Sequence, residues 1–236
     1  MVTTKEKYLA KALVGGDGVY SSVARLVNLR KTWKPNEVGM AAEAILPLTK
    51  DIDEDVLQIH LGVIPFGYGW VFPRKKTVSA GLGTTNPRFF SQMKRFFDFV
   101  KEIYGRPTNF KPYPHLIQLS GCSSRLNIFT DRVILVGDAV GFVDPLTWEG
   151  IYYAIVSGEL AAYTISEAIQ EGPLNERLLR KYLEMCRNMI WRKMRIAFHL
   201  SRAFYANLNL IERLLLANKT ISGCLLKMAL TRISNK

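Results

Sequence analysis

Apolar and polar residues follow several distinct spacing patterns along this chain, and each pattern predicts a different element. Four consecutive aliphatic residues at 133–136 predict a strand that is covered on both faces. The long apolar run 151–169 predicts a helix, and apolar spacing typical of helices recurs over 88–104 and 179–190. Extended segments separated by turns are expected over 50–79. The pattern therefore predicts a mixed α and β protein.

One extended segment carries three aromatic residues on alternate positions. Tyr68, Trp70 and Phe72 fall on the same face of a strand, because successive side chains point to opposite sides. A face of three rings suits a long hydrocarbon and offers little to a compact polar molecule. The alternative is an aromatic core strand, since aromatic residues favour strands in any case.

A glycine-punctuated turn joins the strand at 133–136 to the helix at 151–169. Gly137 and Gly141 bracket Asp138, so a ligand can approach the main chain beside one acidic acceptor. The following helix directs unpaired N–H groups and partial positive charge at the same turn. This arrangement suits a polar, partly anionic ligand, and the alternative is an ordinary strand-turn-helix unit.

Composition narrows the class of protein. The chain has 236 residues, 48% of them hydrophobic and 22% charged, which indicates a globular protein of one large or two modest domains. The formal net charge is +12, and most of the excess lies after Leu174. A basic amphipathic surface suits an anionic membrane, although a solvated helix face is an alternative. No nucleic-acid partner is expected, because no zinc-finger spacing or RNA-binding signature is found.

The cysteines and the histidines are scattered, so no metal site is expected. Cys122, Cys186 and Cys224 form no Cys-x-x-Cys pair. No signal peptide is apparent, and the leucine-rich segment 208–230 is too interrupted by charges to span a bilayer. We expect a reducing, cytoplasmic location, peripheral to the membrane.

Residues 137–151 resemble the second flavin-binding motif of FAD-dependent oxidoreductases. The resemblance rests on Gly-Asp-Ala, a proline seven positions after the Asp, and Glu-Gly-Ile before a helix. It implies that Asp138 hydrogen-bonds the ribityl chain of FAD and that Gly150 and Ile151 lie at the pyrimidine edge of the flavin ring. The cofactor-binding residues that it implies in this segment are Gly137, Asp138, Ala139, Gly141, Pro145, Glu149, Gly150 and Ile151.

A second string, residues 13–25, is similar to the Asp-Gly motif of flavin hydroxylases and prenyl reductases. In it Asp17 and Gly18 are implied to bind the cofactor, and Arg25 sits where a helix can direct it at phosphate. Common turns also contain Gly-Gly-Asp-Gly. Its order relative to Asp138 agrees with those families.

The aromatic segment resembles the Tyr-x-Trp-x-Phe-Pro signature of geranylgeranyl reductases, including archaeal enzymes that saturate membrane lipids. The resemblance implies an FAD-dependent reductase of carbon–carbon double bonds in geranylgeranyl chains, with a geranylgeranyl lipid or diphosphate as substrate. Tyr68, Trp70, Phe72 and Pro73 are then the substrate-binding residues. The catalytic proton donor is not identified; Tyr68 is a weak candidate by side-chain chemistry alone. The electron donor is unknown.

The resemblance also predicts the domain organisation. We expect a partial FAD-binding three-layer α/β (α+β) fold from residues 1–30 and 116–172, an inserted antiparallel-sheet substrate domain over 31–115, and a C-terminal helical region over 173–236. A Gly-x-Gly-x-x-Gly turn is not found at the start. The chain is therefore expected to match the later part of such a reductase, with the ADP-binding segment missing or supplied by a second polypeptide.

Two other functions stay open. One is a non-catalytic reductase fragment that binds a lipid or a partner, which the missing ADP-binding turn and Trp148 both favour. Trp148 stands where relatives usually carry Gly. The other is a flavin hydroxylase, whose family shares the first two motifs but lacks the Tyr-Gly-Trp-Val-Phe-Pro string.

Overall fold

The chain divides into two compact units in the computed structural model. The structure describes residues 2–50, 52–86, 93–104, 111–119, 126–171, 175–208 and 210–211. Met1–Glu37 and Gln118–Leu200 form the first unit, and Val38–Ile117 and Ser201–Lys236 form the second. These boundaries differ from the predicted domains 1–30 with 116–172, 31–115 and 173–236, which stay a prediction.

The first unit is built on a three-stranded sheet in the order β1-β8-β7. β1 (Leu13–Gly15) runs parallel to β8 (Val133–Leu135), and β7 (Phe129–Thr130) is antiparallel to it. Neighbouring side chains of β8 enter different clusters: Ile134 packs with residues of the long helices, and Leu135 packs with Ala24. The sheet is therefore covered on both faces, as the aliphatic run at 133–136 predicts.

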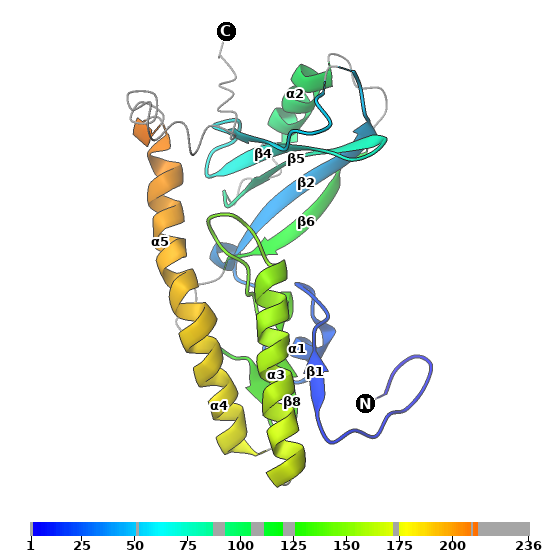
Figure 1. Ribbon diagram of the computed structural model, residues 1–236, viewed down its shortest axis with the longest axis vertical. Coiled ribbons are helices and arrows are strands. Elements are labelled where there is room, and N and C mark those ends of the chain that lie inside the picture. The colour runs from blue at the N-terminus through cyan, green and yellow to red at the C-terminus, as the bar shows by residue number, and fades with distance from the viewer. Residues whose placement is uncertain are drawn as a thin grey trace. The chain divides into compact units, whose positions relative to one another are not determined.

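Helices form the outer layers of the first unit. α1 (Ser22–Leu26) lies on one face, and α3 (Ile151–Glu171) and α4 (Glu176–Cys186) lie on the other. Figure 1 shows α3 and α4 side by side, and Lys181 Nζ of α4 lies 2.6 Å from Glu167 Oε2 of α3. A π-helical turn, η4 (Arg187–Trp191), leads into α5 (Arg192–Ala206). Short 3-10 turns occur at η1 (Pro35–Glu37) and η3 (Gly137–Ala139).

The second unit contains a five-stranded sheet in the order β3-β4-β5-β2-β6. Its strands are β2 (Val38–Pro47), β3 (Gln58–Leu61), β4 (Gly67–Pro73), β5 (Thr77–Thr84) and β6 (Tyr113–Gln118). The pairs β3-β4, β4-β5 and β5-β2 are antiparallel.

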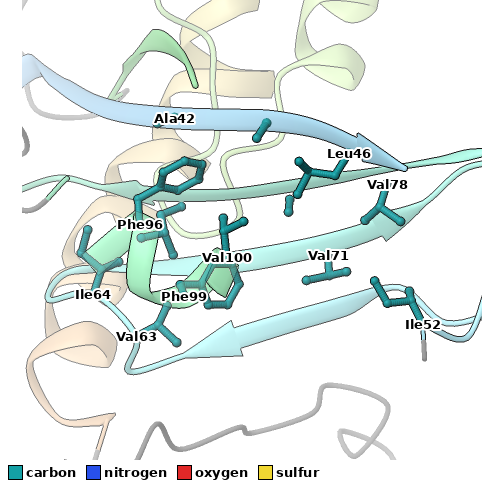
Figure 2. Packing of buried hydrophobic residues seen from close by; sticks show 13 residues of the cluster. Ala42, Leu46, Ile52, Val63, Ile64, Val71, Val78, Phe96, Phe99 and Val100 are labelled. Atoms are coloured by element: carbon teal, nitrogen blue, oxygen red, sulfur yellow. The ribbon is translucent and has the colours of Figure 1, made fainter. Parts of the chain in front are cut away.

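The helix α2 (Met93–Tyr104) covers one face of this sheet. Figure 2 shows Phe96, Phe99 and Val100 of α2 on the same face of the sheet as Val71 and Val78, and all five side chains are buried in one cluster. Since strand side chains alternate, the aromatic positions of β4 lie on the opposite face from α2.

The mixed α/β fold class is confirmed, and α2 and α3 fall where the apolar spacing predicts helices. Parts of several predictions lie outside the described residues: 88–92 of the first predicted helix, Cys122, Cys224 and most of the segment 208–230. Cys186 is buried in the first unit. Within the described residues, no helix combines the length and the apolarity needed to cross a bilayer.

Candidate functional site

The loop after β8 has a shape that requires glycine at both ends. Gly137 and Gly141 have φ angles of +56° and +95°, in the left-handed region. A Cβ atom on Gly137 would lie 3.0 Å from Cβ of Ala154, so α3 packs tightly on the loop. The backbone N–H of Gly137 also donates to Oγ of Ser157, at 2.9 Å. The helix and the loop are therefore fixed against each other.

Asp138 lies beside the start of α3, although twelve residues of chain separate it from Ile151. A Cβ atom on Gly150 would lie 3.2 Å from Oδ1 of Asp138, so the carboxylate reaches the backbone just before the helix begins. Burial raises the pKa of Asp138, and a hydrogen bond from the Gln118 side chain offsets part of that rise. The loop and the helix N-terminus thus form one corner with a half-buried acidic acceptor.

The connection 144–150 holds the remaining residues of this motif. Pro145 is buried, and Oδ1 of Asp144 accepts hydrogen bonds from the N–H groups of Leu146 and Thr147. Glu149 caps the helix, because its Oε1 accepts from the N–H of Tyr152 at 2.7 Å. Ile151 opens α3 and is 77% exposed. The predicted residues from Gly137 to Ile151 therefore lie together in space, and their roles toward FAD stay a prediction.

Three side chains outside the motifs hold the same loop. Arg30 Nη1 donates to the carbonyl of Ala139 at 2.8 Å, and its guanidinium stacks 3.6 Å from the centroid of the Trp33 ring. Gln118 Nε2 donates to the carbonyl of Asp138 at 3.2 Å. No motif or periodicity indicates these contacts, since Arg30 and Ala139 are 109 positions apart.

Asp17 caps α1. Its carboxylate accepts hydrogen bonds from Ser21 Oγ at 2.5 Å and from the N–H groups of Ser22 and Val23 at 2.7 and 3.0 Å. Burial alone would raise the pKa of Asp17, but these hydrogen bonds lower it. Arg25 donates within the same segment, to Tyr20 O and Ser22 Oγ. The cofactor role of Asp17 and the phosphate role of Arg25 stay predictions.

Gly18, the other residue of the Asp-Gly pair, has a φ angle of +78° and no atom within 4 Å of a Cβ position. The space beside it is open. Its assignment to the cofactor also stays a prediction.

The three aromatic residues of β4 form a continuous row in the second unit. Ring centroids lie 6.2 Å apart for Tyr68 and Trp70, and 6.4 Å apart for Trp70 and Phe72. A Cβ atom on Gly81 would come within 2.1 Å of the Trp70 ring, so this glycine makes room for the indole. The rings are half-buried, as is Pro73 at the end of the strand. The rings are tilted against each other, by 60° for Tyr68 and Trp70 and by 31° for Trp70 and Phe72, and together they form an apolar row along β4.

Two polar groups belong to the aromatic row. Trp70 Nε1 donates to Ser79 Oγ at 3.0 Å, which fixes the indole. Burial raises the pKa of Tyr68 to about 12. Its hydroxyl therefore keeps its proton at neutral pH.

Known proteins resemble this chain in sequence over most of its length. It is 32% identical over 91% of its length to an uncharacterized protein of Methanosarcina barkeri, covering 54% of that protein. It is 33% identical over 73% of its length to a digeranylgeranylglycerophospholipid reductase of Methanosphaerula palustris, and it covers 44% of that protein. It is 30% identical over 82% of its length to the chloroplastic geranylgeranyl diphosphate reductase of Nicotiana tabacum, and it covers 42% of that protein. No family model matches the chain.

Solved structures share its fold. A geranylgeranyl bacteriochlorophyll reductase-like protein from Thermoplasma acidophilum matches 83% of this chain with 51% of its own, at a TM-score of 0.73 and 24% identity. A probable FAD-dependent monooxygenase from Pseudomonas aeruginosa matches 84% with 56% of its own, at a TM-score of 0.55 and 18% identity.

These solved proteins share the mixed α/β fold of this chain. By sequence, the chain belongs to the geranylgeranyl reductase family. It spans about half the length of the curated relatives that it matches.

The two aspartates are predicted to respond to pH in opposite directions. The folded pKa of Asp138 is raised above its ordinary value of 3.8, so its stabilising contribution is present below that pH and is lost as pH rises through the folded pKa. Asp138→Asn should therefore be at least as stable as wild type at pH 7 and lose that advantage below about pH 4. Urea unfolding of wild type and Asp138→Asn, at pH 7 and below about pH 4, measures the difference in the free energy of unfolding.

Asp17→Asn is the matched control. The folded pKa of Asp17 is lowered, so its contribution is present above 3.8 and is lost as pH falls through the folded pKa. This variant should lose about 1–2 kcal/mol at pH 7, as for a lost helix cap. An Asp138→Asn variant that is less stable than wild type at pH 7 would contradict the prediction, because it would mean that the ionised carboxylate stabilises the fold.

Trp148 is predicted to carry backbone strain. Its φ angle is +62°, in a region that glycine adopts without steric cost. Trp148→Gly and Trp148→Ala both remove the indole, but only the first relieves the backbone, so it should be more stable than Trp148→Ala by about 1 kcal/mol. Thermal or urea unfolding of the pair measures the difference; equal stabilities would show that the position is unstrained.

Proposed function

We propose that this chain is the flavin-ring and substrate part of an FAD-dependent reductase that saturates carbon–carbon double bonds in geranylgeranyl chains. The observation that carries the proposal is the corner formed by Asp138, Gly150 and the first turn of α3, where a carboxylate stays half-buried beside a helix N-terminus. A fold that needed only packing would favour an apolar or neutral side chain there. A ligand with hydroxyl donors would pair with the Asp138 carboxylate, and an anionic edge of the same ligand would suit the N-terminus of α3.

The residues present fit the ring-bearing half of FAD. The carboxylate of Asp138 is an acceptor for ribityl hydroxyls, and the partial positive charge at the start of α3 suits the electron-rich pyrimidine edge. The left-handed turns at Gly137 and Gly141 keep side chains out of the approach. When bound, FAD in its reduced form supplies a hydride to an alkene. The chain's own contribution is to bind and orient the ring and the substrate.

The aromatic row supports a hydrocarbon substrate. Tyr68, Trp70 and Phe72 present three half-buried rings along β4, and Gly81 leaves space for the central indole. Such a surface favours an extended isoprenoid chain and excludes water. The names of the matched relatives include both a glycerophospholipid and a diphosphate, so a geranylgeranyl lipid or a geranylgeranyl diphosphate is the substrate class proposed.

Tyr68 remains a weak candidate for the proton donor. Its pKa of about 12 means that the hydroxyl is fully protonated at neutral pH, and also that it releases the proton reluctantly. Donation from Tyr68 would therefore show no pH dependence of its own below about pH 10.

A partner segment is proposed for the free edge of the first sheet. Among the described residues β1 pairs only with β8, so β1 is an edge strand whose other side can pair with a further strand. Ile151, Tyr152 and Ile155 at the start of α3 are exposed apolar residues. We propose that an ADP-binding segment, from a second polypeptide or from further sequence of the same one, completes the sheet. The relatives' roughly doubled length supports this. The electron donor has no candidate.

Peripheral contact with a membrane, from the cytoplasmic side, is also proposed. Met189, Ile196 and Leu200 recur at helical spacing along η4 and α5, and their exposed fractions are 51%, 63% and 56%. Arg192, Lys193 and Arg195 lie between them. An exposed apolar stripe flanked by cations suits the surface of an anionic bilayer, where a lipid substrate would be found.

A second function is favoured by one observation. Trp148 stands in a left-handed conformation beside the proposed site, where an indole can obstruct a ring. A non-catalytic module that binds a lipid or a partner would keep the aromatic row without retaining the cofactor. A flavin hydroxylase is less favoured, because the aromatic string has no place in that family's motifs.

The reductase activity is testable with the full chain, FAD, a chemical reductant and a geranylgeranyl lipid, with and without a separately produced ADP-binding segment. Mass spectrometry should detect the gain of two hydrogens for each reduced bond. Trp70→Ala, which removes the centre of the aromatic row, should lower kcat/KM by about tenfold or more, and Trp70→Phe should restore much of it.

Tyr163→Ala, which removes an exposed aromatic of α3, is the matched control and should leave the rate unchanged. Flavin uptake without any mass gain would favour the non-catalytic module, and an added oxygen atom in the product would favour a hydroxylase. A Trp70→Ala variant as active as wild type would overturn the substrate assignment.

Membrane contact is predicted to depend on the stripe on η4 and α5. The chain should sediment with vesicles that contain anionic phospholipid, less so in high salt, and only weakly with zwitterionic vesicles. The triple variant Met189→Ser, Ile196→Ser and Leu200→Ser should lose most of this binding, because its exposed apolar area is removed. Val56→Ser with Leu57→Ser, exposed apolar residues of the second unit, is the control. Equal binding by all three proteins would contradict the proposal.

A further inference from the structure

Gln118 carries a polar atom that the folded chain leaves without a partner. Its side chain is buried, at 1% exposure, and Oε1 has no hydrogen-bond partner among the described residues. Buried polar groups are nearly always hydrogen-bonded, and an unmet acceptor costs stability. None of the sequence motifs includes this residue.

The orientation of the amide is fixed by its other end. Nε2 donates to the carbonyl oxygen of Asp138 at 3.2 Å, and reversing the amide would set two acceptors against each other. Oε1 is therefore the end left over. The side chain also lies against the loop, because a Cβ atom on Gly141 would be 3.3 Å from Cγ of Gln118.

The neighbouring groups restrict what Oε1 can accept. Arg30 Nη1 donates to the next carbonyl, that of Ala139, and Trp33 Nε1 donates to the carbonyl of Val19, so each of these two donor atoms already has an acceptor other than Gln118. The carboxylate of Asp138 beside the amide repels anions. A neutral donor such as a hydroxyl group fits an amide oxygen next to a carboxylate.

We infer that Gln118 is a further cofactor-binding residue, whose Oε1 accepts a hydrogen bond from a hydroxyl of the flavin's ribityl chain. The inference rests on the proposed function, and it names a second acceptor for the same part of the cofactor that Asp138 is proposed to hold. Gln118 also fixes the Asp138 carbonyl through Nε2, so one side chain shapes the loop and contacts the ligand.

Flavin probes with and without the ribityl chain test this. Riboflavin and lumiflavin, which lacks the ribityl chain, are titrated into the full chain and followed by quenching of flavin fluorescence. Gln118→Met keeps the volume and removes both polar atoms. It should weaken riboflavin about tenfold, as for one buried hydrogen bond, and leave lumiflavin unchanged. Gln58→Met, in the second unit, should change neither.

The melting temperature of the ligand-free proteins separates a ligand role from a structural one. Gln118→Met should melt within a few degrees of wild type, because it removes an unmet acceptor together with one donor. Unchanged riboflavin affinity would overturn the inference while leaving the proposed function intact. A variant that melts far lower and weakens both flavins equally would also overturn it. A wild-type chain that binds neither flavin would overturn the inference and the proposed function together.

Discussion

The packing of α3 on the loop after β8 is the constraint on which the proposed site depends. Gly137 has no side chain, so Ala154 of the helix can approach the loop, and Ser157 anchors its backbone. That contact brings Gly150 and the start of α3 beside the carboxylate of Asp138. A larger residue at 137 would separate the two halves of the corner, because a Cβ there already meets the helix and its φ angle disfavours any side chain.

Glycine has a comparable role in the second unit, but for a different reason. A Cβ atom on Gly81 would overlap the Trp70 ring, so the absence of a side chain at this position of β5 leaves space for the indole. Phe96 and Phe99 of α2 cover the other face of the same sheet. The aromatic row therefore lies on the face that α2 does not cover. The sheet therefore separates a packed core from an apolar surface suited to a ligand.

Elements with strong local patterns were predictable from the sequence. The run 133–136 and the helix that begins at Ile151 follow from apolar spacing, and the one-sided placement of Tyr68, Trp70 and Phe72 follows from strand alternation. Trp148 was notable in sequence for replacing a usual glycine, and its positive φ angle gives the physical reason why glycine is the easier residue.

Contacts between distant segments were not predictable. Arg30 and Gln118 reach consecutive carbonyls of the loop from 109 and 20 positions away, and no periodicity encodes such pairings. The family resemblance assigns Asp17 to the cofactor, and this assignment stays a prediction. The structure adds that its carboxylate caps α1 by accepting from Ser21 and Ser22, a contact that the resemblance did not indicate. Spacing indicates which residues share an element, and tertiary packing decides what their polar atoms meet.

Hydrogen–deuterium exchange of the full chain with and without FAD tests most directly whether the Asp138 corner holds a flavin. Added FAD should slow exchange of the amides at 137–141 and in the first turn of α3, while α2 in the other unit exchanges as before. Protection that is absent from both segments at saturating FAD, or that appears only elsewhere in the chain, would contradict the assignment of this corner to the cofactor.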